Sequence, residues 1–395
     1  MTIIQFDKLP LAGKKIFCRV DFNVPLDDRQ RVGDDTRIQA ALPTIKHILN
    51  AGGFLICASH LGRPKGKPTP ELKMEPVGVR LAELLGSDHR VLVTDEATGD
   101  GVRKVVMDME QSDVVLLENL RFHPGEKKND ETFAKDLASL AEIYVNDAFG
   151  SAHRAHASTF GMVSHFKRKG AGFLMMKEVE ALSQLLGNVR RPYCAVLGGA
   201  KVSDKIGVLE SLLERVDVLL IGGAMANTFI KANGGEVGNS FVEDEKLDLA
   251  KHILERAKKK GTEVLLPSDV VVASGIDSTT SGIVQANKVP SGHMALDIGP
   301  KTQKDFGEKI LVAHTIFWSG PMGVFEKPLF ASGTLAVARA VAEAKGMSVV
   351  GGGDSVSAVK KSGVADRIGH ISTGGGASLE FIEGKKLPGI EALEA

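Results

Sequence analysis

The chain has 395 residues, which is too long for one ordinary hydrophobic core and suits two domains of roughly 150–200 residues. Hydrophobic residues make up 43% and charged residues 25%, the usual balance of a globular protein, and 49 basic residues offset 49 acidic ones. Such a chain has no overall field that would draw it to nucleic acid or to an anionic membrane, so we expect neither partner. Any anion site must depend on a local cluster of cations.

The N-terminal segment and the cysteines indicate the compartment. Residues 1–15 lack the basic-then-apolar order of a signal peptide, and no run of about 18 apolar residues could span a membrane. Cys18, Cys57 and Cys194 lie in apolar segments without regular spacing, which predicts reduced core thiols and no disulfide framework. We therefore expect a cytoplasmic location.

The first half alternates strand-like and helix-like segments. Apolar runs predict strands at 16–20, 54–58, 91–94, 114–117 and 143–145. Apolar spacings of three and four predict helices at 36–50, 76–85 and 131–140. Pro43 predicts either a kink in the first helix or a helix that begins there. The proline-rich segment 62–75 predicts an exposed loop.

After residue 172 the alternation of strand-like and helix-like segments is interrupted by one longer helical pattern. Residues 173–186 form one amphipathic stripe between Gly172 and Gly187, which predicts a helix that connects two domains. Beyond it, apolar strands followed by glycine and a helix recur. Parallel strands joined by helical crossovers are the economical interpretation, and ligands then bind at the carboxyl ends of the strands. The predicted fold class is therefore α/β.

In the first half, the predicted strands stop at Asp, Asn, Arg and His. The segments are RVDFN (19–23), SHLGR (59–63), ENLRFH (118–123) and NDAFGSAHRAH (146–156). Arg and His side chains suit a small, highly charged anion, and these would share one rim of a parallel sheet. The candidate anion-binding residues are Arg37, His60, Arg63, Arg121 and Arg154, and Asp21 and Asn23 could hold a hydroxyl or orient those arginines. The basic run 167–169 lies outside this frame and predicts a solvated loop.

In the second half, the strands stop at glycine. The segments are GGAKVSDK (198–205), GGAMA (222–226), GGGDS (351–355) and TGGGAS (373–378). Glycine at a helix N-terminus lets a phosphate reach backbone N–H groups. Lys201 and Lys205, one helical turn apart, could face one ligand, although a tight turn with two solvated lysines also explains them. Asp354 could hold Mg²⁺ or could simply cap its helix.

In the order in which they occur, these segments resemble the motifs of phosphoglycerate kinases. RVDFNVP, SHLGRP, ENLRFH, NDAFGSAHRAHAS, GGAKVSDK, GPMGVFE, GGGDS and STGGGASLE carry the resemblance, together with residues 35–38, and it covers about 16–393. It implies two Rossmann-like domains, each a parallel sheet with helices on both faces, that face a central cleft. It also implies a monomer and hinge-type domain closure, with hinge candidates at Gly172, Gly187 and 373–376.

The resemblance also implies a domain organisation. Residues 1–172 would form the phosphoglycerate-binding domain, 173–187 the interdomain helix, and 188–378 the nucleotide-binding domain. Residues 379–395 would return to the N-terminal domain.

The implied activity is reversible phosphoryl transfer between 1,3-bisphosphoglycerate and ADP, which gives 3-phosphoglycerate and MgATP. The candidate anion-binding residues would bind the phosphoglycerate together with Asp21 and Asn23. The implied nucleotide-binding residues are Gly198, Gly199, Lys201, Lys205, Glu326, Gly352, Gly353, Asp354 and Ser355. Asp354 would hold Mg²⁺, Glu326 would meet the ribose, and Trp318 would pack nearby. The implied catalytic residues are Arg37, Lys205 and Gly375.

One position departs from the family pattern. The family usually has Asn after this Trp, whereas this chain has Ser319, which is shorter and has one donor where Asn has two. We expect altered nucleotide affinity and retained activity.

Two other functions are compatible with parts of the pattern. A kinase acting on acetate or aspartate would not need the several arginines. A two-lobed protein that senses a phosphorylated metabolite would not need Lys201, Lys205 and Asp354 together.

Overall fold

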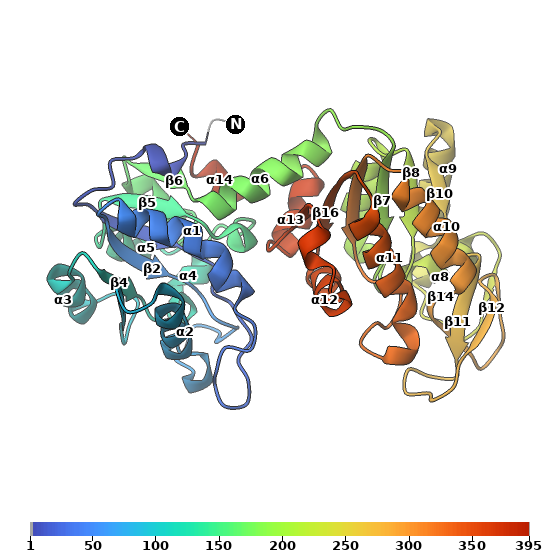
Figure 1. Ribbon diagram of the computed structural model, residues 1–395, viewed down its shortest axis with the longest axis horizontal. Coiled ribbons are helices and arrows are strands. Elements are labelled where there is room, and N and C mark those ends of the chain that lie inside the picture. The colour runs from blue at the N-terminus through green and yellow to red at the C-terminus, as the bar shows by residue number, and fades with distance from the viewer. Residues whose placement is uncertain (1–2, 395) are drawn as a thin grey trace. The chain divides into compact units, whose positions relative to one another are not determined.

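The computed structural model describes residues 3–394, which form two compact units (Figure 1). The first unit contains the chain up to Glu180 and again from Lys386 onward. The second unit contains Ala181–Lys385. The division therefore falls within helix α6 (Phe173–Leu186). The functional domain boundaries that the sequence suggests at 172, 188 and 379 remain a prediction, because compactness alone does not define a functional domain.

The first unit is built on a parallel six-stranded sheet in the order β3-β4-β2-β1-β5-β6. Its strands are β1 (Lys15–Arg19), β2 (Phe54–Ala58), β3 (Arg90–Val93), β4 (Asp113–Leu116), β5 (Ile143–Asn146) and β6 (Lys169–Ala171). Its helices are α1 (Thr36–Asn50), α2 (Glu75–Leu85), α3 (Asp100–Asp108), α4 (Gly125–Lys128), α5 (Glu131–Ala138) and α14 (Pro388–Glu391). Buried runs such as Ile16–Cys18 in β1 are typical of parallel strands that are covered on both faces.

The second unit repeats this plan with a parallel sheet in the order β10-β8-β7-β15-β16-β17. Its parallel strands are β7 (Tyr193–Leu197), β8 (Val218–Ile221), β10 (Glu263–Leu265), β15 (Thr315–Ser319), β16 (Met347–Gly351) and β17 (His370–Ile371). Its helices are α7 (Ile206–Leu213), α8 (Met225–Ala232), α9 (Leu247–Lys260), α10 (Pro300–Leu311), α11 (Ser332–Glu343), α12 (Gly353–Ser362) and α13 (Gly376–Ile382). Figure 1 shows α10 and α11 side by side over the sheet.

Two parallel sheets with helical crossovers confirm the predicted fold class. The five predicted strands of the first half and the connecting helix all form, within a residue at each end. Helix α1 begins at Thr36 and continues through Pro43, so the alternative that it starts at Pro43 is wrong. Cys18, Cys57 and Cys194 are buried free thiols, as expected.

The sequence pattern missed other elements. Helix α3 and strand β6 were not predicted, and Lys169 begins β6, so the prediction of a solvated loop over 167–169 is wrong at that residue. The second unit also has an antiparallel sheet of β11 (Asp269–Ala273), β12 (Gly282–Gln285) and β14 (Met294–Ile298). A short parallel pair joins β9 (Glu236–Val237) to β13 (Lys288–Val289). Short strands without clear alternation give little periodic signal.

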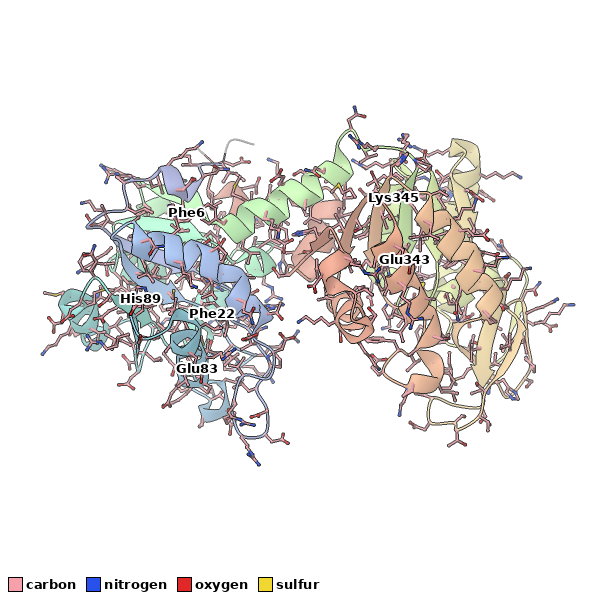
Figure 2. The ribbon with its side chains drawn as sticks, in the orientation of Figure 1. Phe6, Phe22, Glu83, His89, Glu343 and Lys345 are labelled. Carbon is pink, nitrogen blue, oxygen red and sulfur yellow. The ribbon has the colours of Figure 1, made fainter. Side chains whose placement is uncertain are left out.

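Each unit has its own hydrophobic core. Phe6 and Phe22 are fully buried in the first unit, whereas the Glu83 side chain is 57% exposed (Figure 2). The returning C-terminal segment completes this core, because the Gly389 N–H donates to the carbonyl of Ala152 at 2.8 Å and its carbonyl accepts from Asn146 at 3.3 Å. In the second unit Trp318 is fully buried and its indole N–H donates to the Gly320 carbonyl at 2.8 Å.

Within residues 3–394, no helix combines the length and the apolar character that crossing a membrane would require.

Asn119 is a structural link in the first unit, and its loss should be costly. Its fully buried amide accepts from the N–H groups of Leu61 and Arg121 and donates to the carbonyls of Leu61 and Leu72, at 2.7–3.1 Å. Asn119→Ala leaves buried backbone groups unpaired, so we expect the free energy of unfolding to fall by about 2–4 kcal/mol in urea titrations. Asn50→Ala, at an exposed position on α1, is the control and should change it by less than about 0.5 kcal/mol. Equal effects would contradict the assignment.

Candidate functional site

The predicted anion-binding residues of the first unit lie at the carboxyl ends of four neighbouring strands. Strands β4, β2, β1 and β5 are adjacent in the sheet, and the segments that follow them supply the candidate side chains. Arg37 lies in the first turn of α1, and its Nη1 donates to Asp21 Oδ2 at 2.9 Å. Asn23 Oδ1 accepts from the Gly62 N–H at 2.8 Å, which ties the loop after β1 to the loop after β2.

Arg121 carries the strongest sign of an absent anion. Its Nη1 donates to the Gly62 carbonyl at 2.8 Å, but its Nε and Nη2 are buried without a hydrogen-bond partner among the described residues. Burial, followed by Arg154 and Arg19, lowers the pKa of Arg121 to about 10, so the group is still cationic at pH 7. Buried N–H groups of a cation are costly to leave unpaired, so these two atoms require an acceptor.

Other cations surround Arg121. Burial, then Arg121, Arg154 and Arg63, lower the pKa of Lys127, so each of the three arginines acts electrostatically on Lys127. Arg154 Nε donates to His153 Nε2 at 3.0 Å, and burial followed by Arg154 lowers the pKa of His153 to about 4. Arg63 is exposed in its loop. Arg63, Arg121 and Arg154 are therefore brought together as predicted from their strand ends, whereas Lys127 and His153 were not singled out.

The buried Arg19, which contacts the predicted residue His60, was also missed. Arg19 is 1% exposed and its Nη2 lies 3.3 Å from Nδ1 of His60, which is 4% exposed. Burial, followed by Arg19, Arg121, Arg154 and Arg37, lowers the pKa of His60 well below its usual value, so the imidazole is neutral. Asp21 Oδ1 lies 4.0 Å from the same ring nitrogen, beyond hydrogen-bond distance.

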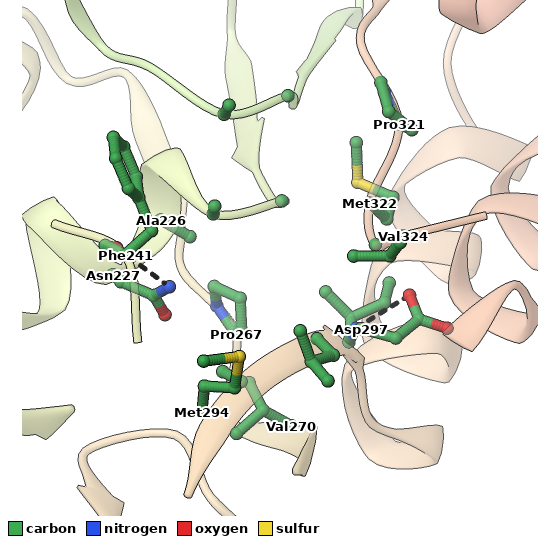
Figure 3. Close-up of a pocket in the computed structure, with 18 of the residues that line it drawn as sticks. Ala226, Asn227, Phe241, Pro267, Val270, Met294, Asp297, Pro321, Met322 and Val324 are labelled. Atoms are coloured by element: carbon green, nitrogen blue, oxygen red, sulfur yellow. Dashed lines mark hydrogen bonds between the residues drawn. The ribbon is translucent and has the colours of Figure 1, made fainter. Parts of the chain in front are cut away.

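The second unit contains a cavity of about 490 Å³ beside the carboxyl ends of its parallel strands (Figure 3). Residues that follow β7, β8 and β15 form one wall, including Gly199, Ala224 and Pro321. The antiparallel sheet supplies the opposite wall through Val270 and Met294. Most of the lining side chains are apolar, which suits a flat aromatic or other apolar group, and Glu326 and Asp354 supply carboxylates.

Two glycines allow the loops at this cavity to approach closely. A Cβ at Gly198 would overlap the Pro321 carbonyl oxygen, and one at Gly223 would lie 2.6 Å from the Gly199 nitrogen. Gly223 also has a φ of +64°, in the left-handed region that favours glycine. The loops after β7, β8 and β15 therefore expose backbone close to the space that a ligand would fill.

Lys205 is the partly buried cation of this unit, and its Nζ donates to Ser319 Oγ at 2.6 Å. Burial lowers the pKa of Lys205 to about 8, against opposing effects of Asp354 and Asp204. Lys201 is exposed and precedes the 3-10 turn Ser203–Lys205, so the expectation that both lysines share one helical turn is wrong. Helix α7 begins only at Ile206, after a bend at Val202 and the 3-10 turn.

The third glycine segment opens α12. Gly352 is its N-cap residue with a φ of +91°, Gly353 is its first residue, and Ser355 Oγ accepts from the Gly320 N–H at 2.6 Å. Asp354 is exposed and lies inside the first turn, and the N-cap position belongs to Gly352, so the explanation of Asp354 as the N-cap is wrong. Gly375 precedes α13 with a φ of +54°.

Asp354 suits a hard cation that keeps most of its water. Residues 3–394 contain no cluster of three or more His, Cys, Asp or Glu that could enclose a metal. Mg²⁺ usually binds one or two carboxylates together with phosphate oxygens, so a single exposed carboxylate beside a phosphate-sized space is sufficient.

Asp297 is a site residue that sequence reasoning missed. It lines the cavity, and its carboxylate accepts from the N–H groups of Ile298 and Gly333 at 2.9 and 2.7 Å (Figure 3 shows the first). Burial raises the pKa of Asp297 to about 7 despite these bonds. It anchors the start of α11 to β14, and the apolar run around it gave no signal of this contact.

Comparison with known proteins identifies the family. The sequence pattern of the family described as phosphoglycerate kinase matches residues 6–385. A phosphoglycerate kinase of Anaeromyxobacter sp. (strain K) is 55% identical over 397 residues, with 100% of each chain covered. One of Koribacter versatilis (strain Ellin345) is 54% identical over 402 residues and covers 100% of this chain and 99% of its own.

Solved structures agree with the sequence match. The phosphoglycerate kinase of Coxiella burnetii has a TM-score of 0.88 at 40% identity, with 99% of each chain covered. That of Pyrococcus horikoshii OT3 has a TM-score of 0.85 at 32% identity and covers 99% of this chain and 98% of its own. The chain belongs to the phosphoglycerate kinase family.

Proposed function

We propose that the chain transfers a phosphoryl group reversibly between 1,3-bisphosphoglycerate and ADP, the reaction of its family, and that it uses the residues described above. The observation that supports this most directly is the pair of buried Arg121 nitrogens without a partner. A cationic cluster of this kind suits a substrate that carries its own phosphate, and acetate or aspartate would leave several of these cations unpaired.

In the first unit, the substrate would be held by charge-assisted hydrogen bonds. We assign phosphoglycerate binding to Asp21, Asn23, Arg37, His60, Arg63, Arg121 and Arg154. The Asp21–Arg37 ion pair supports this assignment, because the 34%-exposed Arg37 side chain keeps guanidinium N–H groups available beside a buried carboxylate. Asp21 and Asn23 would hold the hydroxyl of the substrate or orient Arg37.

In the second unit, the nucleotide would occupy the cavity of about 490 Å³. We assign its binding to Gly198, Gly199, Lys201, Lys205, Glu326, Gly352, Gly353, Asp354 and Ser355. The apolar lining would take the base, Glu326 would accept from the ribose hydroxyls, and the N-terminus of α12 would face the phosphates. Asp354 would hold Mg²⁺, which supplies positive charge to the phosphate oxygens when it is bound.

The mechanism requires neutralisation of charge, and it requires no general base. The acceptor in the ATP-consuming direction is a carboxylate, which is ionised at pH 7. Negative charge accumulates on the transferred phosphoryl group, and we assign its stabilisation to the Arg37 guanidinium, the Lys205 ammonium and backbone N–H groups near Gly375. The Ser319 hydroxyl holds the Lys205 ammonium in place through their 2.6 Å hydrogen bond.

A coupled assay with 3-phosphoglycerate and ATP tests the function and the role of Arg37 together. We expect robust wild-type turnover and a fall in kcat of about two to four orders of magnitude in Arg37→Ala, because a cation at the transferred group stabilises the transition state by several kcal/mol. Arg31→Ala removes an exposed arginine paired with Asp27 and serves as the matched control, with kcat unchanged. Inactive wild type would refute the function, and a normal kcat in Arg37→Ala would refute the role alone.

Because Lys205 loses its proton at alkaline pH, we expect the use of the nucleotide to weaken there. Because the pKa of Lys205 is lowered to about 8, its ammonium is present below that pH and lost above it, so kcat/KM for ADP should fall as pH rises through about 8. An alkaline decrease in kcat/KM that persists in Lys205→Arg would assign the titration to another group.

Ser319→Asn offers the nucleotide an additional N–H while its carbonyl can still accept from Lys205, so KM for ADP should fall more than about twofold. Ser357→Asn, exposed on α12, is the control.

The two proposed sites belong to different units, so phosphoryl transfer requires that the bound substrates come into line. We propose closure about Gly172, Gly187 and 373–376, which would also exclude water from the acyl phosphate. Small-angle scattering should give a smaller radius of gyration with 3-phosphoglycerate and a non-hydrolysable ATP analogue together than with either alone. A radius that stays constant with both present would argue against closure.

A further inference from the structure

The buried side chain of Arg19 determines how His60 can meet a ligand. All three guanidinium nitrogens of Arg19 have partners inside the first unit: Nε donates to Ser158 Oγ at 2.8 Å, Nη1 to the Val20 carbonyl, and Nη2 to His60 Nδ1 at 3.3 Å. With 1% of its surface exposed, Arg19 is in place to orient neighbouring groups and has little access to a ligand itself.

The direction of each hydrogen bond in this chain follows from chemistry. A guanidinium has donors and no acceptor and keeps its proton at physiological pH, so His60 Nδ1 must accept and can carry no proton. Burial and four arginines lower the pKa of His60, so the ring is neutral and its single proton lies on Nε2. Within residues 3–394, Arg19 is the only hydrogen-bond partner of the ring, which leaves the Nε2–H available to a ligand.

The Asp21 carboxylate, which could favour the Nδ1-protonated tautomer of His60, has other partners. Asp21 Oδ1 is 4.0 Å from His60 Nδ1 and accepts from the Asn23 N–H at 3.3 Å, while Asp21 Oδ2 accepts from Arg37. A carboxylate at hydrogen-bond distance would hold the proton on Nδ1, but none of the described residues supplies one.

A second buried pair fixes Arg19 in turn. Ser158 Oγ accepts from Arg19 Nε and donates its own proton to Glu126 Oε1 at 2.6 Å, and the Ser158 N–H donates to Glu126 Oε2 at 3.0 Å. Glu126 is fully buried, so its charge compensates the buried guanidinium through the shared hydroxyl. Arg19 therefore donates in two directions: through Nε to Ser158, which donates onward to Glu126, and through Nη2 to His60 Nδ1.

We propose that Arg19 is a positioning residue that holds His60 in its neutral, Nε2-protonated tautomer and so makes His60 a hydrogen-bond donor to an anionic oxygen of the phosphorylated substrate. The identity of the substrate rests on the proposed function, but the tautomer does not. His60 thereby adds a neutral donor among the cations, which directs the substrate without adding to the repulsion between them.

The tautomer can be read directly by long-range ¹H–¹⁵N correlation on ¹⁵N-histidine-labelled protein at pH 7, with the His60 signals assigned by their loss in His60→Gln. We expect Nδ1 with a lone-pair shift and Nε2 with a protonated shift in the ligand-free protein. A protonated Nδ1, or a doubly protonated ring, would overturn the proposal whether or not the protein is active. Ser158→Ala, which frees Arg19 from one anchor, should bring the two nitrogen shifts closer together as the tautomers mix.

Kinetics provide the second arm. Arg19→Lys should raise KM for 3-phosphoglycerate by about tenfold, the loss expected for one hydrogen bond, with KM for ATP unchanged. The same substitution in a His60→Gln background should change KM less than about twofold, because the orienting contact no longer exists. Arg90→Lys, at the exposed Arg90 side chain that pairs with buried Asp113, is the matched control and should alter neither the tautomer nor KM. Equal effects of Arg19→Lys in both backgrounds would refute the positioning role, and absence of any turnover in wild type would refute the proposed function instead.

Discussion

The burial of the Arg121 guanidinium beside other cations is the constraint on which the first unit depends. Arg121 keeps two buried nitrogens unpaired, and its pKa is lowered to about 10 by burial and by Arg154 and Arg19. Such an arrangement destabilises the ligand-free protein, so the surrounding structure must hold it in place. The Asn119 amide bonds and the Glu126–Ser158 pair do this by fixing the loops and the nearest guanidinium.

In the proposed function, the second unit would bind a polyanion by different means. Its loops approach so closely that Gly198 and Gly223 have no room for a side chain, and α12 begins directly after β16. Backbone N–H groups and one partly buried ammonium then replace a cluster of arginines. Because backbone dipoles carry no net charge, the cavity can remain largely apolar where a base would bind and still accept phosphates at one end.

Much of this was accessible from the sequence because the information is local. Each apolar run that stops at a polar or glycine segment marks the end of a parallel strand, and parallel pairing brings such ends together, which is why Arg63, Arg121 and Arg154 were predicted to act as a group. Lys201 and Lys205 were misplaced because their spacing allowed a helical turn, whereas the chain there forms a loop and a 3-10 turn. Asp297 and Glu126 were missed because their roles depend on partners 35–36 and 32 residues away, respectively, and leave no periodic signal.

Ser319 shows how a departure from a family pattern acquires physical meaning only in the fold. On the sequence alone, the loss of an amide suggested a weaker nucleotide contact. In the structure the hydroxyl at the end of β15 is fully buried and accepts from Lys205 Nζ at 2.6 Å, so in the proposed function Ser319 would act on the nucleotide through the lysine. An ammonium that burial brings close to neutrality at pH 8 retains its proton more readily when an acceptor and an anion are beside it. Nucleotide binding should therefore raise the pKa of Lys205, so that Lys205 takes up a proton from solvent. The negative charge of the nucleotide would in this way favour the protonated form of the lysine that neutralises it.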